Sequence, residues 1–230
     1  MQLVKELAQG FSHLLFPKLC EGCNSPLMKG EDVLCLQCES LLPFTHYHHL
    51  PENETVLRLS GRVPFRHATS LAYFTQQSLL QHLIHGLKYK DRRQNGIFLG
   101  KELGKAIAPL HWGIDAVVAV PLHRKKEAKR GYNQSSFIAE GIAAVLNIPV
   151  LENVIVRNRF TESQTDKTRE QRIENVSKAF EIRKPDVIKG KHLLLTDDVL
   201  TTGATLESCA LSLLSVPQVS VSIATIGIAK

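Results

Sequence analysis

Short apolar runs of strand type alternate with longer stretches of helical spacing along most of the chain. In the helical stretches apolar residues recur every three or four positions, whereas the strand-type runs are short and nearly continuous. Strands are predicted at 68–74, 115–120, 150–156, 192–196 and 219–228, and helices at 77–88, 96–107, 134–146 and 203–214. This order predicts an α/β protein with a Rossmann-like parallel sheet and helices on both faces.

Two of these elements carry a more specific pattern. Gly96, Gly100 and Gly104 are four residues apart, a stripe that favours close packing against another helix. The same stretch falls one residue short of a Walker A loop and has Glu102 where that loop needs Ser or Thr, so we reject a nucleoside triphosphate site. In the last strand polar and apolar residues alternate, which predicts a half-buried or edge position.

The chain before residue 60 lacks this alternation and contains four of the five cysteines. Cys20, Cys23, Cys35 and Cys38 form two C-x-x-C pairs, an arrangement that offers Zn²⁺ four thiolates in a closed shell without water. The predicted role of the zinc is therefore structural. Disulfides are the alternative, which a reducing compartment and the adjacent pairs disfavour. We expect a small module that the metal ion holds together.

Three further features belong to this part of the chain. The first 17 residues have the spacing of an amphipathic helix. His46, His48 and His49 could form a second metal site, but no Cys or acidic partner lies at ligand spacing, so a surface loop is favoured. The polar stretch 52–61 is interpreted as a linker.

Composition narrows the class of protein. Of 230 residues 43% are hydrophobic and the mean hydropathy is near zero, which predicts a folded core rather than disorder. The net charge of +6 suits anionic ligands and permits nucleic acid without demanding it. No run reaches the roughly 18 apolar residues of a membrane span. Lys5 and Glu6 interrupt the N-terminal apolar stretch where a secretory signal is continuous, so a cytoplasmic location is expected.

Two carboxylates and a run of small residues follow the strand at 192–196. Asp197 and Asp198 come first, and Thr201 to Thr205 leads into the next helix. A loop at a helix N-terminus can turn several N–H groups toward a phosphate. The carboxylates repel that phosphate and suit hydroxyl groups, so the pair of features predicts a sugar phosphate ligand at a strand's carboxyl end. The alternative is an ordinary strand–helix turn with a side-chain cap.

A basic stretch follows the predicted strand at 115–120. Residues 124–130 contain five cations and the single acid Glu127, in what is expected to be a loop. Because the stretch begins just beyond a strand's carboxyl end, an anion site, with pyrophosphate as the anion, is favoured over a solvated loop. Another basic run lies at 88–93.

The residues of these segments resemble a known family. Asp197 to Thr205 resembles the phosphoribosyl pyrophosphate (PRPP) binding motif of type I phosphoribosyltransferases. Pro121 to Gln134 resembles a segment of the ComF (ComFC/GntX-like) branch, with Tyr132 in place of the more usual Phe. With the two C-x-x-C pairs the resemblance covers nearly the whole chain. Further matching positions are Arg157 or Arg159, Thr161, Gln164, Arg172, Asn175, Val176 and Phe180.

The resemblance implies a type I phosphoribosyltransferase fold and a role for each motif. Asp197 and Asp198, which we take as the catalytic pair, are expected to hold the ribose hydroxyls of PRPP. Mg²⁺ is expected to accompany PRPP, and the zinc site is expected at Cys20, Cys23, Cys35 and Cys38. The expected PRPP-binding residues are Thr201, Thr202, Gly203, Ala204 and Thr205 for the 5′-phosphate, and Lys125, Lys126 and Arg130 for the pyrophosphate.

Two other segments were weighed for chemistry. The polar stretch 157–180 is long for a connection inside a domain, which favours a functional flap, with a solvated helix as an equal alternative for any single residue in it. Cys209 falls on the apolar face of its predicted helix, where a small core residue is favoured over a nucleophile.

These observations predict two domains and leave two functions open. Residues 1–60 form the N-terminal helix and zinc module, and residues 61–230 the phosphoribosyltransferase-like domain. The favoured function is a PRPP-binding protein of DNA uptake or natural competence, with PRPP or a nucleotide, single-stranded DNA and DNA-uptake proteins as partners. The alternative is an active phosphoribosyltransferase of nucleotide salvage that joins a base to PRPP and releases pyrophosphate.

Overall fold

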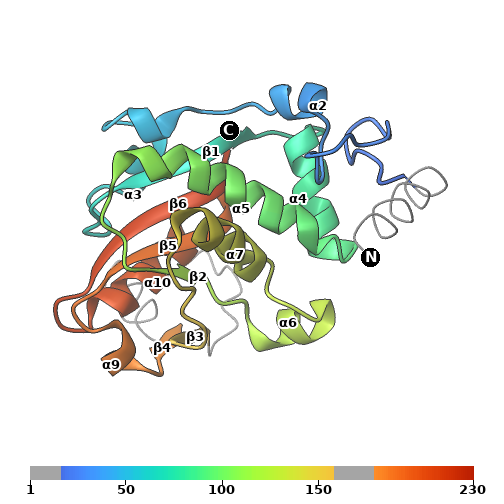
Figure 1. Ribbon diagram of the computed structural model, residues 1–230. Helices are drawn as coiled ribbons and strands as arrows, with labels where there is room; N and C mark the ends of the chain where they lie inside the picture. Colours follow the sequence, from blue (N-terminus) through green and yellow to red (C-terminus); the bar gives the residue numbers. More distant parts are fainter. Residues whose placement is uncertain (1–16, 158–178) are drawn as a thin grey trace, which may run out of the picture.

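The computed structural model describes residues 17–157 and 179–230. The predicted N-terminal helix, and the matching positions from Arg159 to Val176 in the polar stretch, lie outside the described residues. Within them, four parallel strands form one sheet in the order β1-β6-β5-β2 (Figure 1). The strands are β1 (Ala68–Phe74), β2 (Ala116–Ala119), β5 (His192–Leu200) and β6 (Ser220–Ala229).

Helices cover both faces of this sheet, which confirms the predicted α/β class. On one face Leu194 packs in a cluster with residues of α4, α5 and α7. On the other, Leu193 and Leu195 pack with residues of α10 (Figure 1). Neighbouring residues of β5 therefore point to opposite faces, as the period of two in a strand requires. The helices are α4 (Leu79–Tyr89), α5 (Arg93–Ile107), α7 (Gln134–Leu146) and α10 (Ala204–Leu214).

Shorter elements complete the described chain. They are α2 (Leu36–Ser40), η1 (Tyr47–His49), α3 (Glu54–Leu59), η2 (Ala108–Leu110), α6 (Arg124–Arg130), β3 (Ile155–Arg157), β4 (Phe180–Ile182) and α9 (Pro185–Ile188). β3 and β4 pair antiparallel, so Arg157 and Phe180, the two ends of the polar stretch, lie side by side.

The predicted glycine stripe is confirmed as a helix crossing. A Cβ atom added at Gly100 of α5 would lie 2.2 Å from the carbonyl oxygen of Ile138 in α7, and one at Gly141 of α7 would lie 2.2 Å from that of Ile97. Contacts this short exclude any side chain. The two helix backbones touch directly because these positions are glycine.

Several predictions on individual elements were wrong. β6 is an interior strand, buried along most of its length. Its polar residues have partners there: the Ser222 hydroxyl lies 2.9 Å from Nε2 of His192, and the Thr225 hydroxyl 2.7 Å from that of Ser70. The strand predicted at 150–156 is not continuous: Val150 forms an isolated bridge with Val117, and β3 begins only at Ile155. β5 extends four residues beyond the predicted end, so both acids lie inside the strand rather than in the turn.

The stretch interpreted as a linker contains helix α3. Its N-cap Asn53 accepts a hydrogen bond from the Val56 N–H at 3.0 Å and donates to the Ala68 carbonyl at 3.0 Å. Leu59 is fully buried in the cluster beside β5, and Thr55 shares a 2.8 Å hydrogen bond with Ser70 of β1. The stretch is polar because only these few side chains face the sheet.

Candidate ligand site and candidate metal centre

The acid pair lies near the carboxyl end of β5, next to the interior strand β6. The Asp198 side chain is buried, and Lys88 at the end of α4 places its Nζ 2.7 Å from Oδ2 of Asp198. A buried carboxylate requires such a partner, because desolvation penalises an isolated charge. Lys88 is thus part of the candidate site, although the sequence showed it only as one cation of a basic run.

Asp197 has a different environment. Ser135 of α7 donates its hydroxyl to Oδ1 of Asp197 at 2.8 Å, and the Asp198 N–H donates to the same oxygen at 2.9 Å. Burial, together with the neighbouring charge of Asp198, raises the pKa of Asp197 to about 7. One acid is therefore ion-paired and the other is easily protonated, so the pair carries less negative charge than two free carboxylates.

The turn between β5 and α10 runs from Thr201 to Gly203. Thr201 and Thr202 are exposed, while Gly203 is buried with φ +81°, in the left-handed region that favours glycine. Ala204 begins α10, whose N-terminus carries the positive end of the helix dipole. The turn and the acid pair are thus consecutive parts of one strand–turn–helix unit, as predicted.

Two arginines reach this turn from α3 and the residues after it. Arg58 donates to the Thr201 carbonyl at 3.1 Å, and Arg62 donates to the Thr202 carbonyl at 2.6 Å. Arg62 also forms an ion pair with Glu207 in the first turn of α10. Sequence reasoning missed both arginines, since they lie about 140 positions from the turn and no local pattern marks them.

The basic stretch 124–130 forms helix α6 rather than a loop. The chain before it leaves β2 beside the strand that carries the acid pair, because the Val120 N–H donates to the Thr196 carbonyl at 2.9 Å. Most of its side chains are exposed, including Lys125 and Lys126. Arg130 donates to Gln134 and lies 5.4 Å from the centre of the Tyr89 ring. The assignment of these cations to pyrophosphate stays a prediction.

The two basic stretches of the sequence meet through that contact. Tyr89 at the end of α4 is 66% exposed, which is unusual for a large aromatic residue, and Lys88 and Lys90 flank it. The end of α4 and α6 therefore form one basic surface around an exposed ring.

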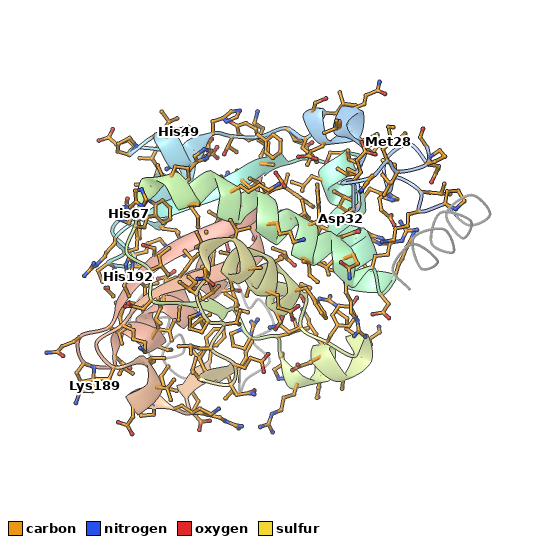
Figure 2. All side chains as sticks on the ribbon, in the orientation of Figure 1. Met28, Asp32, His49, His67, Lys189 and His192 are labelled. Carbon is orange, nitrogen blue, oxygen red and sulfur yellow. The ribbon has the colours of Figure 1, made fainter. Side chains whose placement is uncertain are left out.

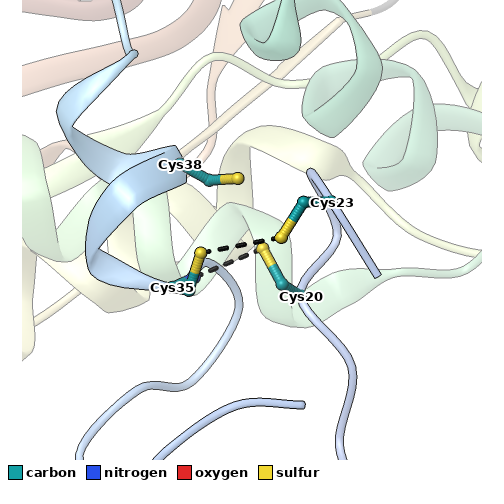
Figure 3. Close-up of side chains that lie close together, drawn as sticks. All are labelled: Cys20, Cys23, Cys35 and Cys38. Carbon is teal, nitrogen blue, oxygen red and sulfur yellow. Dashed lines mark hydrogen bonds between the residues drawn. The ribbon is translucent and has the colours of Figure 1, made fainter. Parts of the chain in front are cut away.

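The four N-terminal cysteines gather as predicted. The sulfur atoms of Cys20, Cys23, Cys35 and Cys38 all lie within 4.8 Å of one another and face a common centre (Figure 3). The Cys23 and Cys35 sulfurs are 3.7 Å apart, close to the roughly 3.8 Å between thiolates that each bind zinc at about 2.3 Å in a tetrahedron. This separation is too long for a disulfide. The cluster can hold a metal ion such as zinc.

The backbone around the cluster supports thiolate ligands. The N–H groups of Gly22 and Cys35 both donate to the Cys20 sulfur at 3.3 Å. Hydrogen bonds from Ser25 lower the pKa of Cys23 to about 6, whereas burial and the neighbouring thiols raise the pKa of Cys38. Gly22 is required there, because an added Cβ would lie 2.8 Å from the Cys38 sulfur. The four cysteines are the group of three or more potential ligands that gathers among the described residues, and His46, His48 and His49 are not part of it.

The cysteine region packs against the sheet domain. Cys20, Leu34 and Cys38 are buried in the same cluster as Leu80 and Leu83 of α4. Glu21 forms an ion pair with Arg92, and the outward-facing Met28 is 76% exposed (Figure 2). A domain boundary near residue 60 stays a prediction.

Cys209 is fully buried in α10, in agreement with its predicted core role. No helix in 17–157 or 179–230 is long and apolar enough to cross a membrane.

The fold places the chain in the class of α/β proteins with an open parallel sheet, here with an N-terminal cysteine cluster that could hold a metal ion. The chain belongs to the family of DNA utilization protein YhgH and the competence proteins F and ComFC. YhgH of Escherichia coli K12 is 30% identical over 222 residues, which cover 87% of this chain and 92% of that protein.

Other relatives and solved structures are more distant. Competence protein F of Haemophilus influenzae is 32% identical over 94 residues, which cover 40% of this chain and 41% of that protein. ComFC of Bacillus subtilis is 25% identical over 201 residues, which cover 86% of this chain and 78% of that protein. Among solved structures, glutamine PRPP amidotransferase from B. subtilis has a TM-score of 0.41 at 21% identity, over 60% of this chain and 30% of that one. Adenine phosphoribosyltransferase from Leishmania tarentolae has a TM-score of 0.40 at 12% identity, over 77% of this chain and 88% of that one. No protein-family model matches the chain.

Proposed function

We propose that this protein binds PRPP at the β5–α10 turn and acts in the uptake or use of DNA. The observation that carries the first part is the strand–turn–helix unit, in which an acid pair and a threonine-rich turn follow each other at the carboxyl end of a central parallel strand. This is the position where open α/β sheets bind nucleotides and sugar phosphates.

Each part of the unit receives one part of the ligand. Asp197 and Asp198 accept hydrogen bonds from the ribose hydroxyls, and the turn from Thr201 to Thr205 holds the 5′-phosphate. Lys88 and the raised pKa of Asp197 lower the negative charge of the acid pair, which reduces its repulsion of an anionic ligand. Mg²⁺ bound with PRPP neutralises part of the diphosphate charge.

The basic surface formed by α4 and α6 supports the second part of the proposal. Cations that contact phosphates provide sequence-independent affinity for DNA, and exposed aromatic rings such as Tyr89 stack on unpaired bases. The names of the relatives, DNA utilization protein and competence protein, point the same way. We assign Zn²⁺ to the four cysteines as a structural ion, and we expect the protein to act in the cytoplasm, where thiolates stay reduced.

The second candidate function is transfer of the ribosyl group to a nitrogenous base. The raised pKa of Asp197 favours it, because a carboxyl group with a pKa near neutrality can exchange a proton with a substrate. In such a reaction pyrophosphate leaves C1′ as the bond to the base forms, and Lys125, Lys126 and Arg130 stabilise its charge.

Calorimetry with PRPP and Mg²⁺ tests the first part directly. Wild type is expected to release heat at one site, and Asp198→Asn to lose it, with thermal unfolding to confirm that the variant is folded. Absence of binding in the wild type contradicts the proposal. Addition of a panel of bases with pyrophosphate release as the readout then separates a binding protein from a transferase.

Single-stranded DNA binding at several salt concentrations tests the second part. The double variant Lys129→Ala, Arg130→Ala is expected to bind more weakly and with a shallower salt dependence. The matched control is Lys184→Ala, Lys189→Ala, which removes two exposed cations near α9, far from α6 (Figures 1 and 2). Equal affinity in the two double variants contradicts the assignment of the basic surface.

A further inference from the structure

The turn after β5 is held from one side by two arginines. Arg58 binds the carbonyl of Thr201 and Arg62 binds the carbonyl of Thr202, so two consecutive peptide groups receive a guanidinium donor each. Both arginines come from α3 and the residues just after it, a segment separate from the acid pair and the turn. Tertiary packing therefore brings the two arginines to the turn.

Peptide geometry converts these contacts into an orientation of the N–H groups. In a planar trans peptide the carbonyl of one residue and the N–H of the next point in opposite directions. Because the carbonyls of Thr201 and Thr202 are directed at the arginines, the N–H groups of Thr202 and Gly203 are directed away from them. Two adjacent N–H groups that point to one side form a concave site for an anion at the start of α10.

Each arginine is itself fixed by further contacts. Arg58 also donates to Glu54 and, at 2.5 Å, to the Ala229 carbonyl at the end of β6. Arg62 binds Glu207 of α10 through two nitrogen atoms. α3 is tied to β1 by Asn53 and Thr55, as described above. The arginines therefore join three separate elements to the turn.

Space and backbone conformation at the turn both favour glycine. A Cβ atom added at Gly203 would lie 3.0 Å from Leu59 and 3.2 Å from Nη1 of Arg62, and its φ of +81° disfavours any other residue. The glycine lets α3 approach closely enough for Arg62 to reach the carbonyl beneath it. Turn and arginines are thus fitted to each other.

We propose that Arg58 and Arg62 are positioning residues, which hold the amides of Thr202 and Gly203 in the orientation that binds the 5′-phosphate. This inference rests on the proposed function and extends it to a segment outside the strand–turn–helix unit. Glu54 and Glu207 neutralise the charges of Arg58 and Arg62. The two arginines therefore orient the turn and add little electrostatic attraction for the phosphate.

The test follows amide signals of the turn by NMR during titration with PRPP and Mg²⁺. The variants are Arg58→Lys and Arg62→Lys, which keep the charge but cannot bind a carbonyl and a carboxylate with one planar group. Arg66→Lys, an exposed arginine without a described contact to the turn, is the matched control. Wild type and control are expected to show shifts at Thr202 and Gly203, and each of the two variants to bind about tenfold more weakly or worse.

Three results are decisive. Loss of affinity in Arg58→Lys and Arg62→Lys, with melting temperatures near that of the control and an unchanged salt dependence of binding, supports the positioning role. Equal affinity in all four proteins overturns it and leaves the proposed function intact. A wild type that shows no shift at either amide overturns the proposed function, and the positioning role with it.

Discussion

The cysteine cluster and the turn after β5 are held in place in opposite ways. Two of the four thiols come from the turn at Cys20–Cys23 and two from the start of the short helix α2, and their sulfur atoms face one point that an ion can fill. The turn instead continues a central strand, and side chains from α3, α4 and α7 hold it and the acids before it. One site therefore depends on a metal ion and the other on the tertiary fold.

The comparison teaches where each site is vulnerable. Loss of the ion should loosen the cysteine region first, and then α4, because both share one buried cluster. A change in helix packing should instead alter the position of the turn, while the metal ion stays bound to the cysteines.

The largest effect is expected from removal of a metal ligand. Cys38→Ser should release the bound ion and lower the free energy of unfolding by roughly 5 kcal/mol or more, since structural zinc contributes about 10–16 kcal/mol in small zinc domains. Metal content by mass spectrometry and urea unfolding measure the two outcomes. Cys209→Ala, at the cysteine outside the cluster, is the control and should keep the metal. Full stability of Cys38→Ser without metal would contradict a structural role for the ion.

A smaller effect is expected from the α5–α7 crossing. Gly100→Ala places a methyl group where the Ile138 carbonyl lies, and overpacking of this kind costs about 1–3 kcal/mol. Lys105→Ala, an exposed position of the same helix, should stay within about 0.5 kcal/mol of wild type. The metal content of both variants should be unchanged. Loss of metal in Gly100→Ala would show that the two sites are not held independently.

The ion pair between Lys88 and Asp198 can be measured by a double-mutant cycle. Lys88→Met leaves a buried carboxylate without its cation, whereas Asp198→Asn removes the need for one. The coupling free energy from urea unfolding is expected to be about 1–3 kcal/mol. Additive effects of the two substitutions would mean that Lys88 is not part of the site.

The last effect is the pH dependence of stability that Asp197 imposes. Its pKa in the folded protein is raised to about 7, so between its ordinary pKa and that value the folded state binds more protons than the unfolded state. Stability is therefore greater at low pH and falls as the pH rises toward 7. Asp197→Asn should remove this fall. Unfolding at several pH values measures it, and identical slopes in the two proteins would contradict the buried, charge-coupled environment of Asp197.

Elements with a local signal could be predicted from the sequence. β1 and α7 were predicted with the bounds that the structure shows, because each is a continuous pattern of one period. The cysteine cluster was predicted as well, since its ligands lie close together in the chain. β6 was misplaced because its alternation indicated solvent, whereas Ser222 and Thr225 find partners inside the sheet.

Residues that act across the fold could not be predicted. α3 has only six residues, too short a stretch for a helical period to distinguish it from a linker. Arg58, Arg62 and Lys88 reach the site through tertiary packing, and no spacing relates them to the acid pair. The local motif thus revealed the centre of the site, and the structure supplied the side chains that surround it.

The most direct test of the central claim is a crystal structure with ribose 5-phosphate bound. The account predicts phosphate oxygens within hydrogen-bond distance of the Thr202 and Gly203 amides, and ribose hydroxyls on Asp197 and Asp198. A turn without ligand at saturating concentration, or a phosphate bound elsewhere while these amides point away from it, would contradict it.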